Sequence, residues 1–258
     1  MEGNLYYRGY DIEDLVTNVI KEDRFGFEET AFLLMMGSLP TKKELSLYNE
    51  ILGDHRELPP GFARDMILTA PSRNIMNKLA RSVLALYSYD DNPDDISIKN
   101  VMRQSMNLMG YFPAIICYAY QAKNNYYENQ SLHMHTPIRE LSTSENILRM
   151  LRPLGEYTDL EAKLLDICMI LHAEHGGGNN SSFTTHLISS TGTDTYSAIS
   201  AAVGSLKGPK HGGANIAVIN MMKDIRAHVK DIGKRSDLDN YLVKILKGEA
   251  NDRTGLVY

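Results

Sequence analysis

Tryptophan is absent from this 258-residue chain, and cysteine occurs only twice. Cys117 and Cys168 both lie in apolar stretches, where an unpaired thiol usually packs as a small buried hydrophobe in a reducing compartment. The sequence therefore excludes a disulfide scaffold and predicts two buried thiols.

Long apolar runs and long basic runs are missing as well. The longest apolar stretch, 111–120, has ten residues and contains Pro113, which is about half of the ~20 residues needed to cross a bilayer. The opening MEGNLYYRG lacks the basic and then apolar pattern of a signal peptide. The 27 basic and 32 acidic residues give a net charge of −5, which does not suit a partner with a phosphate backbone. We therefore expect a cytoplasmic protein that binds neither a membrane nor nucleic acid.

The chain is rich in signals for the ends of helices. Thr41 to Glu44 and Thr158 to Glu161 have the capping-box pattern, in which a threonine and a glutamate satisfy each other's free backbone amides. The first pattern predicts a helix over 42–54. A related pattern at Ser236 to Asp239 precedes NYLVKILKG, with Gly248 as the expected stop.

Apolar spacing predicts further helices over 27–36, 73–89 and 94–122. Gly110 and Pro113 should interrupt and kink the last of these, because proline removes a backbone donor and crowds the preceding turn. No segment alternates cleanly with a period of two, so no sheet is expected. The predicted fold class is all-α and multihelical.

Two polar stretches have simpler interpretations. The segment 121–145 is expected to form a long surface connection. The acidic residues Asp90, Asp91, Asp94 and Asp95 lack the ligand spacing and central glycine of a calcium loop. They are expected to be a solvated acidic helix start.

The segment LHAEHGGGNNSSFTTH, 171–186, is the most informative stretch. His172 and His175 share one helix face if the preceding helix continues that far. The three glycines that follow let backbone amides approach an anion, and Asn179 stands beside an expected new helix N-terminus. These features describe a pocket for a small carboxylate. The alternative is a glycine C-cap followed by an asparagine N-cap, with the histidines satisfied by their neighbours.

A second segment, LKGPKHGGANIAVINMM, contains His211. Gly208 and Pro209 should end a helix begun near Asp194, and the glycines after His211 should open the next one. A helix N-terminus disfavours protonated imidazole, so a neutral ring there can donate a hydrogen bond to an oxygen that becomes negative. The alternative is a histidine in a tight turn between helices with no task.

A zinc hydrolase is a further alternative. His172 and His175 would be ligands, His186 or His211 a third ligand, and Glu174 a base. The glycines directly after His175 argue against a rigid ligand helix, so we expect no metal site.

Five stretches of the chain, taken in order, match one known family. They are YYRGYDIEDLV, FEETAFLLMMGSLPTKKEL, LHAEHGGGNNSSFTTH, GSLKGPKHGGAN and NDRTGLVY. Together they resemble the citrate synthases, in which the third and fourth stretches correspond to two histidine motifs and the fifth to the approach to another. The resemblance runs from about residue 5 to the last residue.

The resemblance implies an architecture. Citrate synthases are almost wholly helical homodimers, joined by a sandwich of antiparallel helices. A smaller domain closes over the substrates that the large domain binds. By this resemblance the large domain is 1–212, and 213–258 begins the smaller one.

The resemblance also implies an activity, the Claisen-type condensation of acetyl-CoA with oxaloacetate to citrate and CoA. His175 would hold oxaloacetate with Asn179 beside it, and His211 would steady the enol or enolate of acetyl-CoA through the thioester oxygen. His172 would have only a supporting part. No cofactor is expected, because acetyl-CoA is a substrate.

The chain departs from the family after GLVY. The family continues with a Gly-x-Gly-His motif, an aspartate that acts as the base and arginines that hold carboxylates. We therefore expect a fragment that is inactive alone and belongs to an active parent. The alternatives are a 2-methylcitrate synthase that uses propionyl-CoA and a non-catalytic dimerisation fragment.

Overall fold

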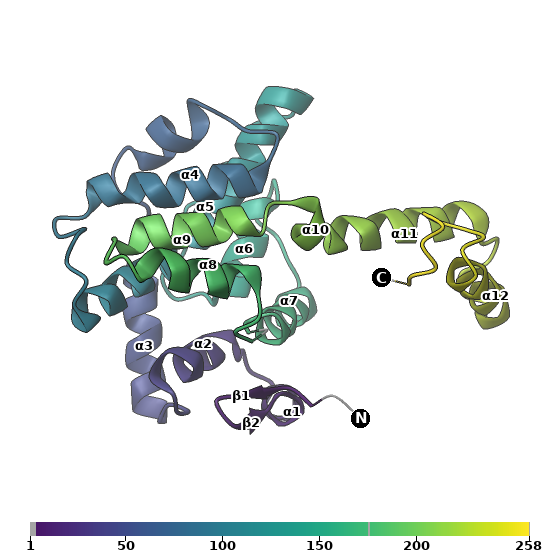
Figure 1. Cartoon of the computed structure of the whole chain (residues 1–258), viewed down its shortest axis with the longest axis horizontal. Coiled ribbons are helices and arrows are strands. Elements are labelled where there is room, and N and C mark those ends of the chain that lie inside the picture. The colour runs from purple at the N-terminus through teal and green to yellow at the C-terminus, as the bar shows by residue number, and fades with distance from the viewer. Residues whose placement is uncertain (1–3, 175, 258) are drawn as a thin grey trace. The chain divides into compact units, whose positions relative to one another are not determined.

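The computed structural model describes residues 4–174 and 176–257, with the backbone alone described for Lys210 and His211. The chain forms two compact units, Met1–Ser205 and Leu206–Tyr258, and Figure 1 shows the course of the chain through each. The assignment of 1–212 to a large domain and of 213–258 to a smaller one stays a prediction.

Nearly all regular structure in the described residues is helical. The first unit contains α1 (Ile12–Lys21), α2 (Phe27–Met36), α3 (Lys42–Asp54), the π-helix η1 (Ala63–Leu68), α4 (Ile75–Leu86), the 3-10 helix η2 (Tyr87–Tyr89), α5 (Ile98–Glu128), α6 (Thr143–Leu151), α7 (Asp159–Leu171), α8 (Asn180–Ser189) and α9 (Thr195–Ser205). The second unit contains α10 (Pro209–Gly212), α11 (Ala214–His228) and α12 (Arg235–Leu246). The described strands, β1 (Tyr6–Tyr7) and β2 (Tyr10–Asp11), form one short antiparallel hairpin. The predicted all-α fold is confirmed.

Helix starts that depend on local capping chemistry are where the sequence places them. Thr41 and Thr158 both form complete capping boxes, at the starts of α3 and α7. The pattern at Ser236 was misread, because α12 already begins at Arg235 and its N-cap makes no side-chain hydrogen bond. A serine within the first turn cannot serve as the cap.

Helix α5 is longer than predicted and runs without a break through Gly110 and Pro113. The predicted interruption is wrong. Gly110 serves packing instead, because a Cβ at this position would overlap the backbone carbonyl of His55. The preceding acidic stretch does not begin the helix, which is capped by Ser97.

The segment 121–145 is only partly a surface connection. Its first part continues α5, and Ser142 forms a capping box that begins α6. The stretch between these helices is tied down by Asn146, whose side chain accepts from the Ile138 amide at 2.8 Å and donates to the Ile138 carbonyl at 3.0 Å. An asparagine that satisfies the backbone in this way can replace regular structure.

The main core of the first unit surrounds α5, which α4, α9 and η1 contact. Cys117 is fully buried in this core, as predicted. Cys168 is exposed, so the prediction of a second buried thiol is wrong. It follows Leu160 and Leu164 along an exposed side of α7, whereas Ile170 lies on the buried side. Within the described residues, no helix is long and apolar enough to cross a membrane.

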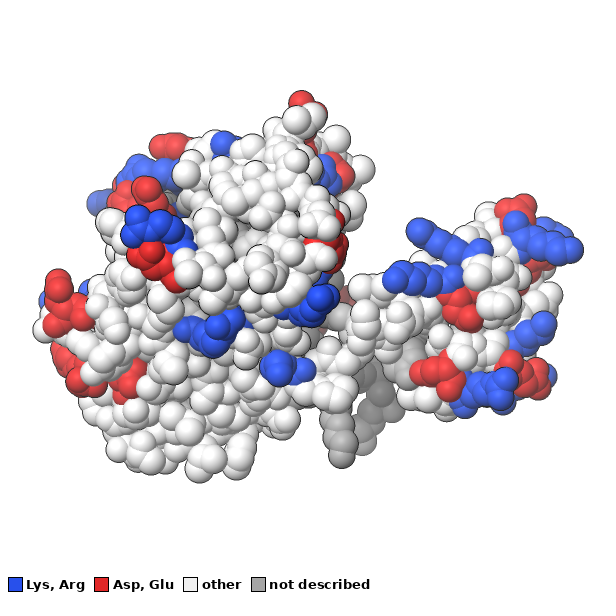
Figure 2. All heavy atoms as spheres, turned by 90° about the horizontal axis from the view of Figure 1, so that it is seen from above, with Lys and Arg blue, Asp and Glu red and all other residues white. Residues whose placement is uncertain are grey.

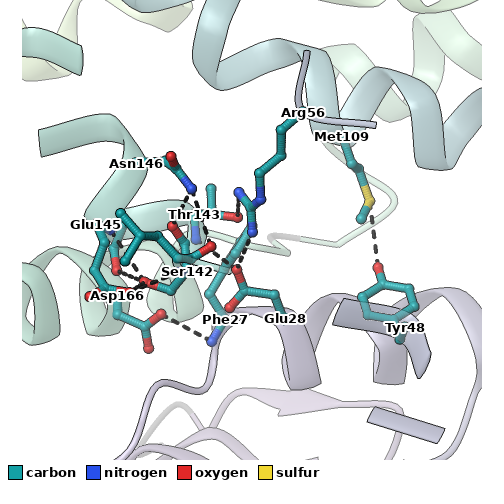
Figure 3. A network of polar contacts seen from close by, with 12 residues as sticks. Phe27, Glu28, Tyr48, Arg56, Met109, Ser142, Thr143, Glu145, Asn146 and Asp166 are labelled. Carbon is teal, nitrogen blue, oxygen red and sulfur yellow. Dashed lines mark hydrogen bonds and ion pairs between the residues drawn. The ribbon is translucent and has the colours of Figure 1, made fainter. Parts of the chain in front are cut away.

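A buried polar network fixes α7 to the start of α2 (Figure 3). Asp166 of α7 accepts hydrogen bonds from the amides of Gly26 at 2.7 Å and Phe27 at 3.3 Å. The N-cap of α2 offers no side-chain hydrogen bond of its own, so Asp166 satisfies amides that the helix start leaves free. Nearby, buried Glu28 accepts from the Thr143 amide and from buried Arg56. Helix α7 is thereby placed by contacts with α2.

Candidate active-site segments

Helix α7 ends at Leu171, before the first candidate histidine pair is complete. His172 is the C-cap, and its Nδ1 donates to the Cys168 carbonyl at 2.6 Å. Because α7 does not extend beyond Leu171, the condition for a shared helix face of the two histidines is not met. His175 itself lies outside the described residues.

A short glycine-rich turn follows α7. The Gly176 amide donates to Oε1 of Glu174 at 2.6 Å, and Gly176 has a φ of +80°, which favours glycine. Gly177 and Gly178 are exposed, and a Cβ at either would meet no atom within 4 Å. Their backbone is therefore accessible to a small ligand.

Asn179 ends this turn as the N-cap of α8. Its Oδ1 accepts from the Ser181 amide at 2.9 Å and from the Ser181 hydroxyl at 2.7 Å. The asparagine cap that the sequence offered as an alternative is therefore present. The role of Asn179 in substrate binding stays a prediction, because one side chain can both cap a helix and line a ligand pocket.

The second candidate segment lies in the other compact unit. Helix α9 ends at Ser205, three residues earlier than predicted. Gly208 is the N-cap of α10 and Pro209 its first residue, an arrangement that suits the fixed φ of proline. Gly208 and Pro209 thus open a four-residue helix that contains the backbone of His211, whereas the sequence predicts that they end a helix.

The glycines after His211 are required by close backbone packing. A Cβ at Gly212 would overlap the Leu206 carbonyl, and one at Gly213 would overlap the Pro209 carbonyl. Gly213 is also the N-cap of α11, which confirms that a new helix opens there. The expected meeting of His175, Asn179 and His211 in one cleft stays a prediction.

In the acidic stretch after η2, Asp91, Asp94 and Asp95 are exposed as predicted, whereas Asp90 is not. The Asp90 side chain is 3% exposed and accepts from Arg103, Gln104 and Tyr196. Burial opposes ionisation, but these hydrogen bonds and one from the Asn92 amide lower the pKa of Asp90 to about 2. Sequence reasoning missed this residue because its partners come from α5 and α9, far along the chain.

Among the described residues, no three or more histidine, cysteine, aspartate or glutamate side chains are placed to hold an ion. The zinc alternative includes the side chains of His175 and His211, which lie outside that description. It is therefore not tested.

Comparison with known proteins identifies the class. The family model described as citrate synthase, C-terminal domain, matches residues 1–255. The crystal structure of citrate synthase from Thermotoga maritima superposes with a TM-score of 0.71 at 31% identity, covering 96% of this chain and 59% of that chain. The helical fold is thus that of a citrate-synthase-like protein.

Curated relatives agree with this class. The citrate synthase of Haloferax volcanii is 34% identical over 231 residues, and the match covers 86% of this chain and 56% of that protein. The 2-methylcitrate synthase of Shewanella oneidensis is 30% identical over 230 residues, with 88% and 57% covered. The chain belongs to the citrate synthase family. It spans about half the length of the curated relatives that it matches.

Proposed function

We propose that this chain is part of an enzyme that condenses acetyl-CoA with oxaloacetate to citrate and CoA. The observation that carries the proposal is the glycine-rich turn between the His172 C-cap and the Asn179 N-cap, in a chain that a citrate synthase family model matches over residues 1–255. His175 and Asn179 are proposed to bind oxaloacetate, and His211 to act on the acyl group. No cofactor beyond the substrates is proposed.

The first segment suits a dicarboxylate. Gly177 and Gly178 are exposed residues, and Asn179, the N-cap of α8, follows directly after them. A glycine-rich backbone that a ligand can approach and the positive end of a helix dipole both favour a carboxylate. The exposed backbone, more than any one side chain, supports an anion site here.

The second segment suits stabilisation of an enolate. Removing a proton next to a thioester produces an unstable anion, so the thioester oxygen needs a hydrogen-bond donor as charge develops on it. His211 lies in the four-residue helix α10, two residues before the N-cap of α11, and the dipole of α11 favours a neutral imidazole there. A neutral ring can donate one hydrogen bond to the enolate oxygen without giving up its proton.

The acyl substrate is proposed to be acetyl-CoA, although relatives of both specificities match the chain. Propionyl-CoA differs by one methylene, which an apolar pocket discriminates by only about 1 to 3 kcal/mol. Thiol release by the natural gene product, measured with each acyl-CoA, tests the choice. A higher kcat/KM for propionyl-CoA would favour 2-methylcitrate synthesis.

A variant pair tests the catalytic role. His211→Ala in the natural gene product should lower kcat by about 10²-fold or more, with little change in the KM for oxaloacetate. His228→Ala is the matched control, since His228 is an exposed histidine of α11. Equal thiol release by wild type and His211→Ala would refute the assignment.

Homodimer formation is also proposed. Large apolar side chains stay exposed on two helices of the first unit, including Leu84 of α4 and Ile116 and Tyr120 of α5. Exposed apolar side chains such as these are typical of an interface, and Figure 2 shows a broad face of the first unit with few charged side chains. Light scattering that finds only monomer at micromolar concentration would contradict the proposal. That result would also argue against the alternative of a non-catalytic dimerisation fragment.

A cytosolic location is proposed from the two unpaired cysteines, Cys117 and Cys168, which suit a reducing compartment. One similar relative, from Arabidopsis thaliana, is named as peroxisomal. Cell fractionation that finds the protein in an organelle would overturn the cytosolic assignment.

A further inference from the structure

The C-terminal end of α7 is held by the hairpin at the start of the chain. Tyr7 is fully buried, and its hydroxyl donates to the Ile170 carbonyl at 2.8 Å. The same hydroxyl oxygen lies 3.4 Å from the Glu174 carbonyl oxygen. That carbonyl belongs to the peptide bond immediately before residue 175. One side chain thus contacts both the last turn of α7 and the backbone that enters the glycine-rich turn.

The hairpin itself explains how Tyr7 reaches this position. Arg8 and Gly9 have φ values of +51° and +91°, the positive values that a two-residue hairpin turn requires. Tyr7 pairs with Tyr10 across the turn. Because side chains alternate along a strand, Tyr7 packs in a buried cluster with Val19, Leu33 and Ile170, among others, whereas Tyr6 is exposed.

The contact matters because a helix end leaves its last carbonyls without partners. The Ile170 carbonyl accepts from the Ala173 amide at 3.2 Å, and the buried Tyr7 hydroxyl supplies a second donor. The adjacent Arg8 acts in the same way at another helix end, donating to the Leu34 carbonyl of α2 through Nε at 3.2 Å and Nη2 at 2.9 Å. Neighbouring residues of one hairpin therefore fasten the C-termini of α7 and α2.

We propose that Tyr7 is a positioning residue whose hydroxyl holds the end of α7 at the Ile170 carbonyl, and thereby positions the backbone that enters the turn to which the proposed function assigns oxaloacetate binding. The ring packs in the buried cluster, and the hydroxyl donates to the backbone at the end of α7. These two roles are separable, because Tyr7→Phe keeps the ring and removes only the hydroxyl. Tyr6→Phe is the matched control: Tyr6 lies in the same strand, is 51% exposed, and its hydroxyl accepts from Asn4.

Amide hydrogen exchange of this chain tests the proposal without any ligand. In Tyr7→Phe, peptides covering 172–179 should exchange about three- to tenfold faster, the factor expected for loss of one hydrogen bond. Peptides from α4 and α5 should keep their wild-type rates, and Tyr6→Phe should match wild type throughout. Unchanged exchange over 172–179, or an increase spread evenly over the whole chain, would overturn the proposal.

Kinetics of the natural gene product provide a readout that packing alone would not change. Tyr7→Phe should raise the KM for oxaloacetate about three- to tenfold and leave the KM for acetyl-CoA unchanged, with Tyr6→Phe as wild type. If Tyr7→Phe only reduced the amount of active enzyme, the apparent kcat would fall and both KM values would stay unchanged. That result would contradict a positioning role for Tyr7. If wild type itself releases no thiol, the proposed function fails, whereas the exchange experiment still decides the role of Tyr7.

Discussion

Replacing Lys78 by methionine should stabilise the first unit at neutral pH. Lys78 of α4 is 1% exposed, and its Nζ donates to the Met66 carbonyl of η1 at 2.7 Å. Among the residues that the structure describes, no carboxylate forms an ion pair with it. Burial, with a smaller contribution from the charge of Arg81, lowers the pKa of Lys78 to about 8.

The size of the effect follows from this pKa. An unfolded lysine has a pKa of about 10.4, and each unit of difference corresponds to about 1.4 kcal/mol, so burying the charged form costs about 3 kcal/mol at neutral pH. Methionine has a similar length and no charge, but it cannot donate to the Met66 carbonyl, and that loss costs about 1 kcal/mol. Lys78→Met should therefore raise the free energy of unfolding by about 2 kcal/mol at pH ~7.

The pH dependence identifies the cause. Because the folded-state pKa lies below the unfolded one, the contribution of Lys78 to stability is complete above about pH 10.5 and is lost as the pH falls through about 8. The advantage of the variant should thus disappear between about pH 8 and pH 10.

Urea denaturation followed by far-ultraviolet circular dichroism, repeated across this pH range, measures the effect. Lys99→Met is the control, since Lys99 is exposed on α5. A difference between wild type and Lys78→Met that does not change with pH would refute the reasoning, as would a variant less stable than wild type at neutral pH.

Three further predictions concern other buried or capping residues. Burial raises the pKa of Asp166 to about 6, so the folded state binds the proton more tightly than the unfolded state. The free energy of unfolding of the wild type should therefore fall by up to about 3 kcal/mol as the pH rises from about 4 to about 7. Denaturation of Asp166→Asn should show no such decrease, and a decrease equal to that of the wild type would contradict the role of Asp166. Gly110→Ala should destabilise the first unit by about 2 kcal/mol or more, because the added Cβ overlaps the His55 carbonyl; a thermal midpoint equal to that of wild type would show that α5 can shift. Asn179→Ala removes the N-cap of α8 and should destabilise this helix by about 1 kcal/mol. The amides of Ser181 and Ser182 should then exchange faster than in the wild type, and equal rates would count against the cap.

The helix boundaries predicted well are those set by residues within one turn of each other. The Thr41 and Thr158 capping boxes each involve a side chain and an amide three residues apart, so no distant contact is needed to form them. The same holds for the helix that opens after Gly213. Local hydrogen bonds decide these helix boundaries, so the boundaries can be predicted from the sequence.

Predictions that depended on which side of a helix is covered were less reliable. Cys117 and Cys168 lie in similarly apolar stretches, yet one is buried and the other exposed. Asp90 was expected in solvent, but Tyr196 and Gln104 bury it. An apolar run predicts a helix and not its orientation, because burial is decided by the neighbouring elements that pack against it.

The sequence by itself determined the helical fold class, the capping boxes at Thr41 and Thr158, the membership of the citrate synthase family and the two segments that carry the candidate histidines. Only the tertiary structure decided that α7 stops before residue 175 and that Tyr7, 163 positions from Ile170, holds its end. Helix caps arise from neighbouring residues, whereas the position of the turn depends on hydrogen bonds between segments that meet only when the chain has folded.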